Sequence, residues 1–412
     1  MKISERIRRS ANGLMTLTVL FIMLAFGLLT ISGGTVDFRA LACGAALSFM
    51  LILCYSVMIR VLFRFDRLLF VVISLLIAIG IIIQYRVEPG DAQKQLIMLL
   101  AGIIACFIVQ WAIRYHEKLR RFIVPMMFAS LGLLAALLFL GRELGGAKNW
   151  ISIAGFSMQP SEFVKIVLVL ALAHVFDSAR KLTSMLPALG FAVVCTVILV
   201  MEKDLGAALL FALTTLTVFF AATGRKLLTL LGLGAGALGA YASYQLFDHV
   251  KYRVAVFRDP WALYEGSGYQ IAQGLMAMAS GGLFGMGLGL GSPKTIPAYH
   301  TDYIFAVICE EFGVIMGVCV IALYIVFIIR GLIIALHAPC RFLTIAAMGC
   351  TFIIAFQSFI IIGGVIKLIP LTGITLPYVS HGGSSIISCM MMFGILQGIA
   401  SLSDSEGENN EY

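Results

Sequence analysis

The sequence consists mainly of apolar runs of about 20 residues separated by short polar breaks, and this pattern constrains the fold more than any other feature. A helix of about 20 apolar residues is long enough to cross the hydrocarbon core of a bilayer. Of the 412 residues, 61% are hydrophobic and 12% are charged. Soluble globular chains carry about 25% charged residues, so this chain lacks the polar surface that it would need in water. The sequence therefore predicts a membrane protein with many spans.

Twelve apolar runs have the length or nearly the length of a membrane span. The first follows the basic segment MKISERIRRS, is longer than the apolar part of a secretory signal, and lacks an Ala-x-Ala cleavage site, so we expect it to remain as a span. The predicted fold is an all-α membrane protein, a helix bundle of about twelve transmembrane helices. Its spans are predicted at residues 14–32, 40–59, 68–85, 95–113, 122–140, 163–176, 186–201, 205–223, 227–247, 303–329, 342–366 and 384–402.

The distribution of Lys and Arg predicts the orientation, because cytoplasmic loops retain an excess of both. Basic residues gather in alternate breaks, at residues 2–9, 60–67, 114–121, 180–181, 225–226 and 330–341. These breaks are predicted to be cytoplasmic, and so are both termini. The net charge of +8 follows from this signal and from the attraction to anionic lipids, so it gives no support for nucleic acid as a partner. The nine cysteines form no CxxC pair or Cys/His cluster and are expected to be buried apolar residues.

Ionisable residues in the apolar runs are candidate functional residues, because a charge at membrane depth is costly. They gather at the predicted outer ends of the spans, at Glu162, Lys165, Glu202, Asp204, Asp302, Glu310 and Glu311. A proton-driven transporter more naturally places its carboxylates near the midplane of the membrane. The outer position therefore favours chemistry at the membrane surface.

Glu162 and Lys165 are three residues apart and are expected to pair on one helix face. Lys165 could serve only as a structural partner or could also bind a pyrophosphate, and the sequence leaves both interpretations open. Pro160 and Ser161 precede the pair, with Ser161 as the expected helix cap.

Asp302 has two interpretations as well. It directly precedes an apolar run, so it could cap that helix, or it could act in catalysis. At 100° per residue, Glu310 lies about 80° from Asp302 around the helix and Glu311 lies on the opposite side, so Glu310 is the better companion.

The longest predicted outer loop, residues 248–302, contains an expected short interfacial helix from about Tyr269 to Ala279. The string GLFGMGLGLG follows it. A nucleotide-binding loop is disfavoured there, because no strand precedes the glycines and the loop faces away from the cytoplasm.

Five strings together identify a family resemblance. These are GAKNWISIAGFSMQPSEFVKI at 146–166, DLGAALLF at 204–211, RDPWALYEGSGYQIAQGLMAMASGGLFGMGLGLG at 258–291, AYHTDYIFAVICEEFG at 298–313 and LPYVSHGGSSIIS at 376–388. In content and order they resemble the SEDS family of FtsW, RodA and SpoVE. Members of that family usually have ten spans. The resemblance therefore implies two additional N-terminal helices within residues 1–67 and a core at 68–402 that includes the outer loop 248–302. The acidic and polar composition of residues 403–412 predicts a short disordered cytoplasmic tail.

The resemblance implies a peptidoglycan glycosyltransferase of the bacterial cytoplasmic membrane that polymerises lipid II on the outer face. The catalytic aspartate of the family's HTDF motif matches Asp302. The matched substrate-binding positions are Lys148, Trp150, Ser161, Glu162, Lys165, Asp204, Gln270, Lys294, His300, Glu310 and Ser384. The implied partner protein is a class B penicillin-binding protein, a transpeptidase. No cofactor is firmly implied, and a divalent cation remains open.

The chain departs from the family pattern at two places. It has Pro297 and Ala298 where members often carry Pro-Glu, and His381 where they often carry Tyr. Two other functions stay open at this point, a lipid II flippase and a non-catalytic scaffold of a division or elongation complex. The sequence also leaves the division, elongation and sporulation roles undecided.

Overall fold

The computed structural model describes residues 2–32, 36–62, 65–144, 147–153, 156–179, 181–266 and 268–409, which are mostly helical. The α-helices are α1 Lys2–Ser32, α2 Phe38–Leu62, α3 Arg67–Val87, α4 Pro89–Arg114, α5 His116–Leu140, α6 Ser161–Ser178, α7 Leu186–Met201, α8 Leu205–Thr223, α9 Lys226–Leu246, α10 Asp248–Arg258, α11 Gly268–Gly281, α12 Ile304–Leu336, α13 Arg341–Val365 and α14 Gly383–Asn409. Two short 3₁₀ helices are η1 Leu182–Met185 and η2 Pro293–Thr295, and three strands are β1 Arg142–Leu144, β2 Ala147–Ile153 and β3 Phe156–Met158.

The described helices confirm a polytopic helical membrane protein. Eleven of them are long and apolar enough to cross a membrane. The remaining predicted span, the sixth in chain order, is α6, which has 18 residues and carries Glu162, Lys165 and Asp177. Helix α6 packs against α5, α8, α13 and α14, and Lys165 lies buried inside the bundle where it pairs with Glu162.

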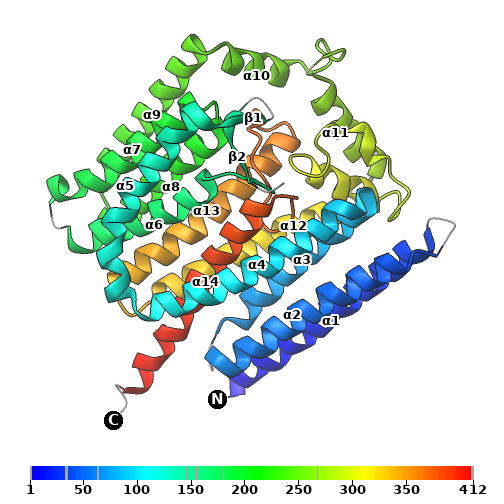
Figure 1. Cartoon of the computed structure of the whole chain (residues 1–412), viewed down its shortest axis with the longest axis horizontal. Helices are drawn as coiled ribbons and strands as arrows, with labels where there is room; N and C mark the ends of the chain where they lie inside the picture. Colours follow the sequence, from blue (N-terminus) through cyan, green and yellow to red (C-terminus); the bar gives the residue numbers. More distant parts are fainter. Residues whose placement is uncertain are drawn as a thin grey trace.

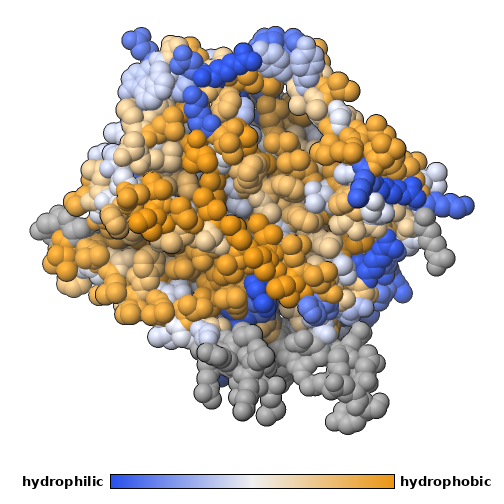
Figure 2. All heavy atoms as spheres, turned by 180° about the vertical axis from the view of Figure 1, so that it is seen from behind, coloured by the Kyte–Doolittle hydropathy of each residue, from blue (hydrophilic) through white to orange (hydrophobic). Residues whose placement is uncertain are grey.

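The two ends of the bundle differ. Both termini lie at one end, at the bottom of Figure 1, whereas α10, α11 and the small sheet lie at the opposite end. In the view from behind, hydrophilic residues gather at the top and along the right and lower edges, with a broad apolar surface between them (Figure 2). This distribution is the one expected of a protein whose middle faces hydrocarbon.

Helices α1 and α2 lie side by side at one edge of the molecule (Figure 1), and α1 also packs against α3. Asn12 Oδ1 accepts hydrogen bonds from the Tyr55 hydroxyl at 2.6 Å and from Arg67 Nη1 at 3.2 Å. The first contact joins α1 to α2, and the second joins α1 to the first turn of α3.

Helices α3, α6, α13 and α14 are the most buried, and α4 and α12 pack against them. Nearly every residue of α3 is buried. At one end of α3, Asp66 Oδ1 caps the helix by accepting from the Leu69 N–H at 2.8 Å, and Asp66 Oδ2 lies 2.5 Å from Arg330 Nη2. Gln397 Nε2 donates to the Asp66 carbonyl at 3.0 Å, so one buried polar cluster joins α3, α12 and α14.

Helix α12 is interrupted, which the sequence analysis did not predict. Gly313 has φ 84° and ψ 168°, far from helical values, and separates two helical parts. Residues 282–291, called the glycine segment below, dock at the break. Met286 and Gly287 donate backbone hydrogen bonds to the carbonyls of Glu310 and Glu311 at 2.9 and 3.0 Å, and Val314 donates to the Gly282 carbonyl at 2.9 Å. The alternating glycines therefore complete the backbone hydrogen bonding of a broken helix.

Two elements were not predicted from the sequence. The strands form a small antiparallel sheet in the order β1-β2-β3. Helix α10 lies in the outer loop in addition to the expected helix near Tyr269, which α11 confirms. Helix α14 continues to Asn409 where a disordered tail was expected from residue 403, because extending an existing helix needs no new nucleation. Residues 410–412 lie outside the described part.

Candidate active site

Asp302 lies in a turn between η2 and α12, and it does not cap the helix. The N-cap position of α12 is Tyr303, and no side chain forms a capping hydrogen bond there. Ala298 has a positive φ of 54°, and its carbonyl accepts from the N–H groups of Thr301 and Tyr303, both at 3.2 Å. This tight turn precedes the helix and leaves the Asp302 carboxylate free for another role. The capping interpretation is therefore wrong.

The Asp302 carboxylate faces residues 366–382, called the central segment below, which connects α13 to α14 and passes through the middle of this end. A β-carbon built on Gly373 would lie 3.7 Å from Asp302 Oδ2. The Ser380 hydroxyl donates to the Thr301 carbonyl at 2.6 Å, and the His381 N–H donates to the His300 carbonyl at 2.9 Å. The HTD motif and the central segment are thus held together by hydrogen bonds at the two residues that precede Asp302.

A cation from α10 reaches the same place. Arg253 Nη1 donates to the carbonyls of Thr372 and Leu371 at 3.0 and 3.4 Å. Its positive charge and a hydrogen bond from Thr301 lower the pKa of Asp302, but burial has the larger effect and raises that pKa to about 6. A carboxylate with such a pKa is ionised at neutral pH and is more basic than an ordinary aspartate, as a general base requires.

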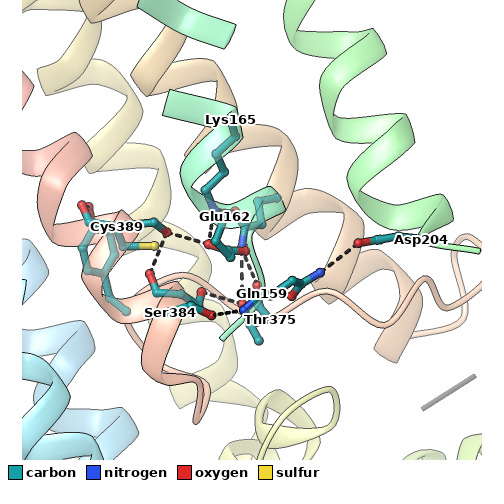
Figure 3. Close-up of polar contacts among 11 residues, drawn as sticks. Gln159, Glu162, Lys165, Asp204, Thr375, Ser384 and Cys389 are labelled. Atoms are coloured by element: carbon teal, nitrogen blue, oxygen red, sulfur yellow. Dashed lines mark hydrogen bonds and ion pairs between the residues drawn. The ribbon is translucent and has the colours of Figure 1, made fainter. Parts of the chain in front are cut away.

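Lys165 and Glu162 form the predicted ion pair within a larger buried network. Lys165 Nζ lies 2.6 Å from Glu162 Oε2 and donates to Gln357 Oε1 at 3.0 Å. Gln357 Nε2 donates to the Thr375 carbonyl at 2.9 Å, so the network reaches the central segment. The Ser388 hydroxyl donates to Glu162 Oε2 at 2.5 Å. Figure 3 shows Lys165 extended towards Glu162, with Thr375 and Ser384 nearby.

Asp204 forms a second branch of polar contacts. It caps α8 through the Ala207 N–H at 3.0 Å, and its other oxygen accepts from Asn149 Nδ2 at 2.6 Å and Gln159 Nε2 at 2.8 Å. The backbone N–H of Gln159 donates to Ser384 Oγ at 3.2 Å, and Gln159 lies between Asp204 and Ser384 in Figure 3. Burial raises the pKa of Asp204, and these hydrogen bonds to its ionised form oppose that rise.

The other predicted residues near this network are placed as follows. Ser161 is buried as the first residue of α6, but the N-cap is Pro160 and Ser161 does not form the expected cap. Trp150 lies in β2 opposite Arg142. Lys148 also lies in β2, and its side chain is outside the described part of the chain.

Glu310 and Glu311 both contact the glycine segment. Glu310 Oε1 accepts from the Ser292 N–H at 3.0 Å. Glu311, which by its spacing lies on the opposite helix face from Asp302, is fully buried and pairs with Arg86 Nε at 3.2 Å. The chain folds back after α11 and places backbone donors beside both carboxylates, the Gly289 N–H beside Glu311 and the Ser292 N–H beside Glu310.

Three predicted residues lie further out. Lys294 is exposed, with Nζ 3.9 Å from Glu88 Oε2. Gln270 is half-buried in the first turn of α11. The rings of His300 and His381 lie 5.9 Å apart, and burial lowers the pKa of His381. His381, where the family often has Tyr, thus contacts the HTD motif directly.

Four residues of this site were not predicted from the sequence, namely Arg253, Gln357, Asn149 and Gln159. Arg253 lies in the outer loop between Lys251 and Arg258, so nothing in the sequence distinguishes it from its basic neighbours. Gln357 is a polar residue in the middle of an apolar run and is a candidate by the same argument that selected Lys165. Among the described residues, no group of three His, Cys, Asp or Glu side chains is arranged to hold a metal ion.

Comparisons with known proteins agree with this architecture. The family model described as "Cell cycle protein", FtsW/RodA/SpoVE, matches residues 56–405. Peptidoglycan glycosyltransferase RodA of Mycobacterium bovis is 36% identical over 81% of this chain and 78% of its own length. Stage V sporulation protein E of Bacillus subtilis is 35% identical over 81% of this chain and 96% of its own length.

Solved structures are similar as well. A chain from a study of how a peptidoglycan synthase complex coordinates polymerisation and crosslinking has a TM-score of 0.70 and 26% identity, and the match covers 82% of this chain and 98% of that chain. The rod shape determining protein RodA of Thermus thermophilus has a TM-score of 0.62 and 27% identity, and the match covers 82% of this chain and 96% of that one. The chain belongs to the FtsW/RodA/SpoVE family of cell cycle proteins.

Proposed function

We propose that the protein is a peptidoglycan glycosyltransferase that polymerises lipid II, with Asp302 as the general base. The observation that carries the proposal is the position of Asp302. It is half-buried, does not cap α12, and lies against Gly373 with a pKa raised to about 6. Named peptidoglycan glycosyltransferases among the relatives support the same reaction.

The proposed reaction forms a β-1,4 glycosidic bond. An acceptor hydroxyl attacks the anomeric carbon of the donor as the bond to the undecaprenyl pyrophosphate breaks, which inverts that carbon. Asp302 takes the hydroxyl proton, and the pyrophosphate leaves with the bonding electrons. Nearby cations stabilise the developing negative charge on the leaving group. Arg253, from α10, is the described cation whose charge acts on Asp302, so it is the first candidate for this role.

The polar network has a supporting role in this proposal. Lys165 is almost fully buried, and its ammonium group is paired with Glu162 and Gln357. Through Gln357 and Thr375 it fixes the central segment that faces Asp302. Asp204, Ser161, Ser384 and Glu162 hold the sheet, α6, α8 and α14 around the same segment. The exposed Lys294 and the half-buried Gln270 and His300 are placed to contact substrate from the surface side.

The proposed orientation puts Asp302 on the outer face of the cytoplasmic membrane and both termini in the cytoplasm. The common end of the termini in Figure 1 and the alternation of basic loops support it. A membrane-impermeant thiol reagent should label a cysteine at Glu265 in intact cells and should not label one at Ser178. The reverse pattern would contradict the proposal.

We further propose that residues 1–67 add two helices to a family core at 68–402, since the family match begins at residue 56. A class B penicillin-binding protein is the proposed partner. One structural relative comes from a peptidoglycan synthase complex that coordinates polymerisation and crosslinking, and this supports a glycosyltransferase bound to a transpeptidase.

The decisive experiment incubates the purified protein with labelled lipid II, with and without the transpeptidase. We expect glycan polymer from the wild type and none from Asp302→Asn. Movement of lipid II across vesicles without polymer formation would instead support a flippase.

A further inference from the structure

A second polar feature lies at the opposite end of the bundle from Asp302. A cavity of ≈ 690 Å³ is bordered by Glu117, Lys118, Arg120, Arg121, Val124 and His174. It lies between the first turns of α5 and the last turns of α6. Helix α6 begins beside the candidate active site and extends over 18 residues, or about 27 Å, to this cavity. The cavity therefore faces the side on which the basic loops are predicted to be cytoplasmic.

The cations of the cavity fall into two groups. Arg120 is held in place, because it contacts Asp177, lies 3.3 Å from Glu117 Oε1, and stacks over Phe342 at 5.1 Å. Lys118 and Arg121 are exposed, and within the described residues neither forms an ion pair with a carboxylate. The cavity thus combines a rigid, charge-balanced wall with two cations that are free to bind an anion.

Aromatic residues place the cavity at the depth of lipid headgroups. Trp111 and Tyr115 are exposed and pack against each other with ring centroids 5.2 Å apart. Lys118 Nζ lies 5.4 Å from the Tyr115 ring centroid. Trp and Tyr are enriched at the boundary between hydrocarbon and headgroups. The aromatic pair beside the cavity therefore indicates that Lys118 reaches the phosphate layer.

An apolar surface continues from the cavity along α5. Phe122, Val124 and Phe128 are exposed there, and they lie one to three turns into a helix that spans the membrane. A ligand with a phosphate at one end and long acyl chains at the other matches both features. A soluble anion would use only the basic part of the cavity.

We propose that this cavity binds the phosphodiester headgroup of an anionic phospholipid from the cytoplasmic leaflet. Lys118 and Arg121 contact the phosphate, and the acyl chains lie along the exposed face of α5. Basic pockets between transmembrane helices on the cytoplasmic side suit anionic headgroups of this kind. The bound lipid would sit at the junction of α5 and α6, at the far end of the helix that carries Glu162 and Lys165.

The test measures lipid retention by native mass spectrometry. The full-length protein is placed in nanodiscs that contain phosphatidylglycerol and phosphatidylcholine, and then released. Three proteins are compared, the wild type, Lys118→Gln/Arg121→Gln, and the control Arg225→Gln/Lys226→Gln. The control removes two exposed cations from another predicted cytoplasmic loop. Arg120 stays unchanged, because its contacts with Asp177 and Phe342 support the fold. A thermal melt confirms that each variant is folded.

We expect the wild type and the control to retain phosphatidylglycerol in preference to phosphatidylcholine. The cavity variant should bind phosphatidylglycerol about 25-fold more weakly, because each of the two cations near the membrane surface contributes about fivefold. An equal loss in the control, or unchanged retention in a folded cavity variant, would overturn the proposal. A second arm adds inorganic phosphate. Displacement of the lipid by this soluble anion would assign the cavity to a free phosphate, whereas continued retention supports the lipid.

Discussion

Gly313 of α12 and Leu283 of the glycine segment lie in direct backbone contact, and a β-carbon on Gly313 would stand 2.2 Å from the Leu283 carbonyl oxygen. The φ of Gly313 is also one that side chains with a β-carbon rarely adopt. The break in α12, which follows directly on the buried Glu310 and Glu311, therefore depends on glycine at this position.

Gly313→Ala should destabilise the protein by about 1–3 kcal/mol, because the backbone conformation is strained and the methyl group displaces the glycine segment. Gly234→Ala in α9 is the matched control, since nothing lies within 4 Å of its β-carbon position. We expect this control to be neutral or more stable by up to about 1 kcal/mol. Thermal unfolding in detergent measures both, and equal stability of the two variants would contradict a required break.

Asp302→Asn should fold normally and lose about 10²–10⁴-fold in polymerisation rate, because an amide cannot accept the hydroxyl proton near neutral pH. The fold should be kept because Asp302 forms no capping hydrogen bond. Asp248→Asn is a control on the same side, since Asp248 is exposed. Polymerisation of labelled lipid II by the purified proteins measures the effect. Near-normal polymer from the Asn variant would exclude Asp302 as the base, and Glu310 would be the next carboxylate to test.

The pH dependence of polymerisation should follow the ionisation of Asp302. The base acts in its deprotonated form, so the rate should rise with pH and reach half of its plateau near pH 6. The positive charge of Arg253 favours the ionised form, so Arg253→Gln should move this midpoint to higher pH. Rates measured from pH 5 to 8 for both proteins test this. A midpoint that stays in place in the variant would show that Arg253 does not act on the base.

Lys165→Met should destabilise the protein by about 3–5 kcal/mol, because it leaves the carboxylate of Glu162 without its cation inside the bundle. The double variant Glu162→Gln/Lys165→Met removes the unpaired charge and should recover part of the stability. Thermal unfolding and the specific activity of the folded fraction are measured together. A single variant of full stability that makes no polymer would instead indicate direct binding of the leaving group by Lys165.

Glu202→Gln should change how stability depends on pH. Both carboxyl oxygens of Glu202 are buried without a partner among the described residues, and burial together with the charge of Asp204 raises its pKa from 4.5 to about 8. The folded state therefore holds the proton more tightly than the unfolded state, and this stabilisation is lost as the pH rises from about 4.5 through about 8. Glu202→Gln should be close to neutral at about pH 4, below the unfolded pKa, and stabilising at about pH 9, above the folded pKa. Parallel melting curves at the two pH values would contradict this.

The membrane fold could be predicted because its dominant requirement is local. Each span needs its own run of apolar residues, whatever its neighbours are, so hydropathy located all twelve predicted helices. The sheet and the break in α12 could not be predicted, because they depend on contacts between segments and not on a local run of residues. Gly313 is an ordinary small residue in the sequence, and its conformation follows only from the glycine segment packed against it.

The candidate site shows the same division. The sequence by itself determined which residues carry charge near the membrane surface and, through spacing, that Glu162 and Lys165 pair. It could not decide between capping and catalysis for Asp302, because that choice depends on the turn around Ala298 and on a segment about 70 residues further along the chain. Only the tertiary structure brings Gly373, Arg253 and Asp302 together, since they lie on three elements whose mutual placement is set by packing and backbone hydrogen bonds rather than by local preference.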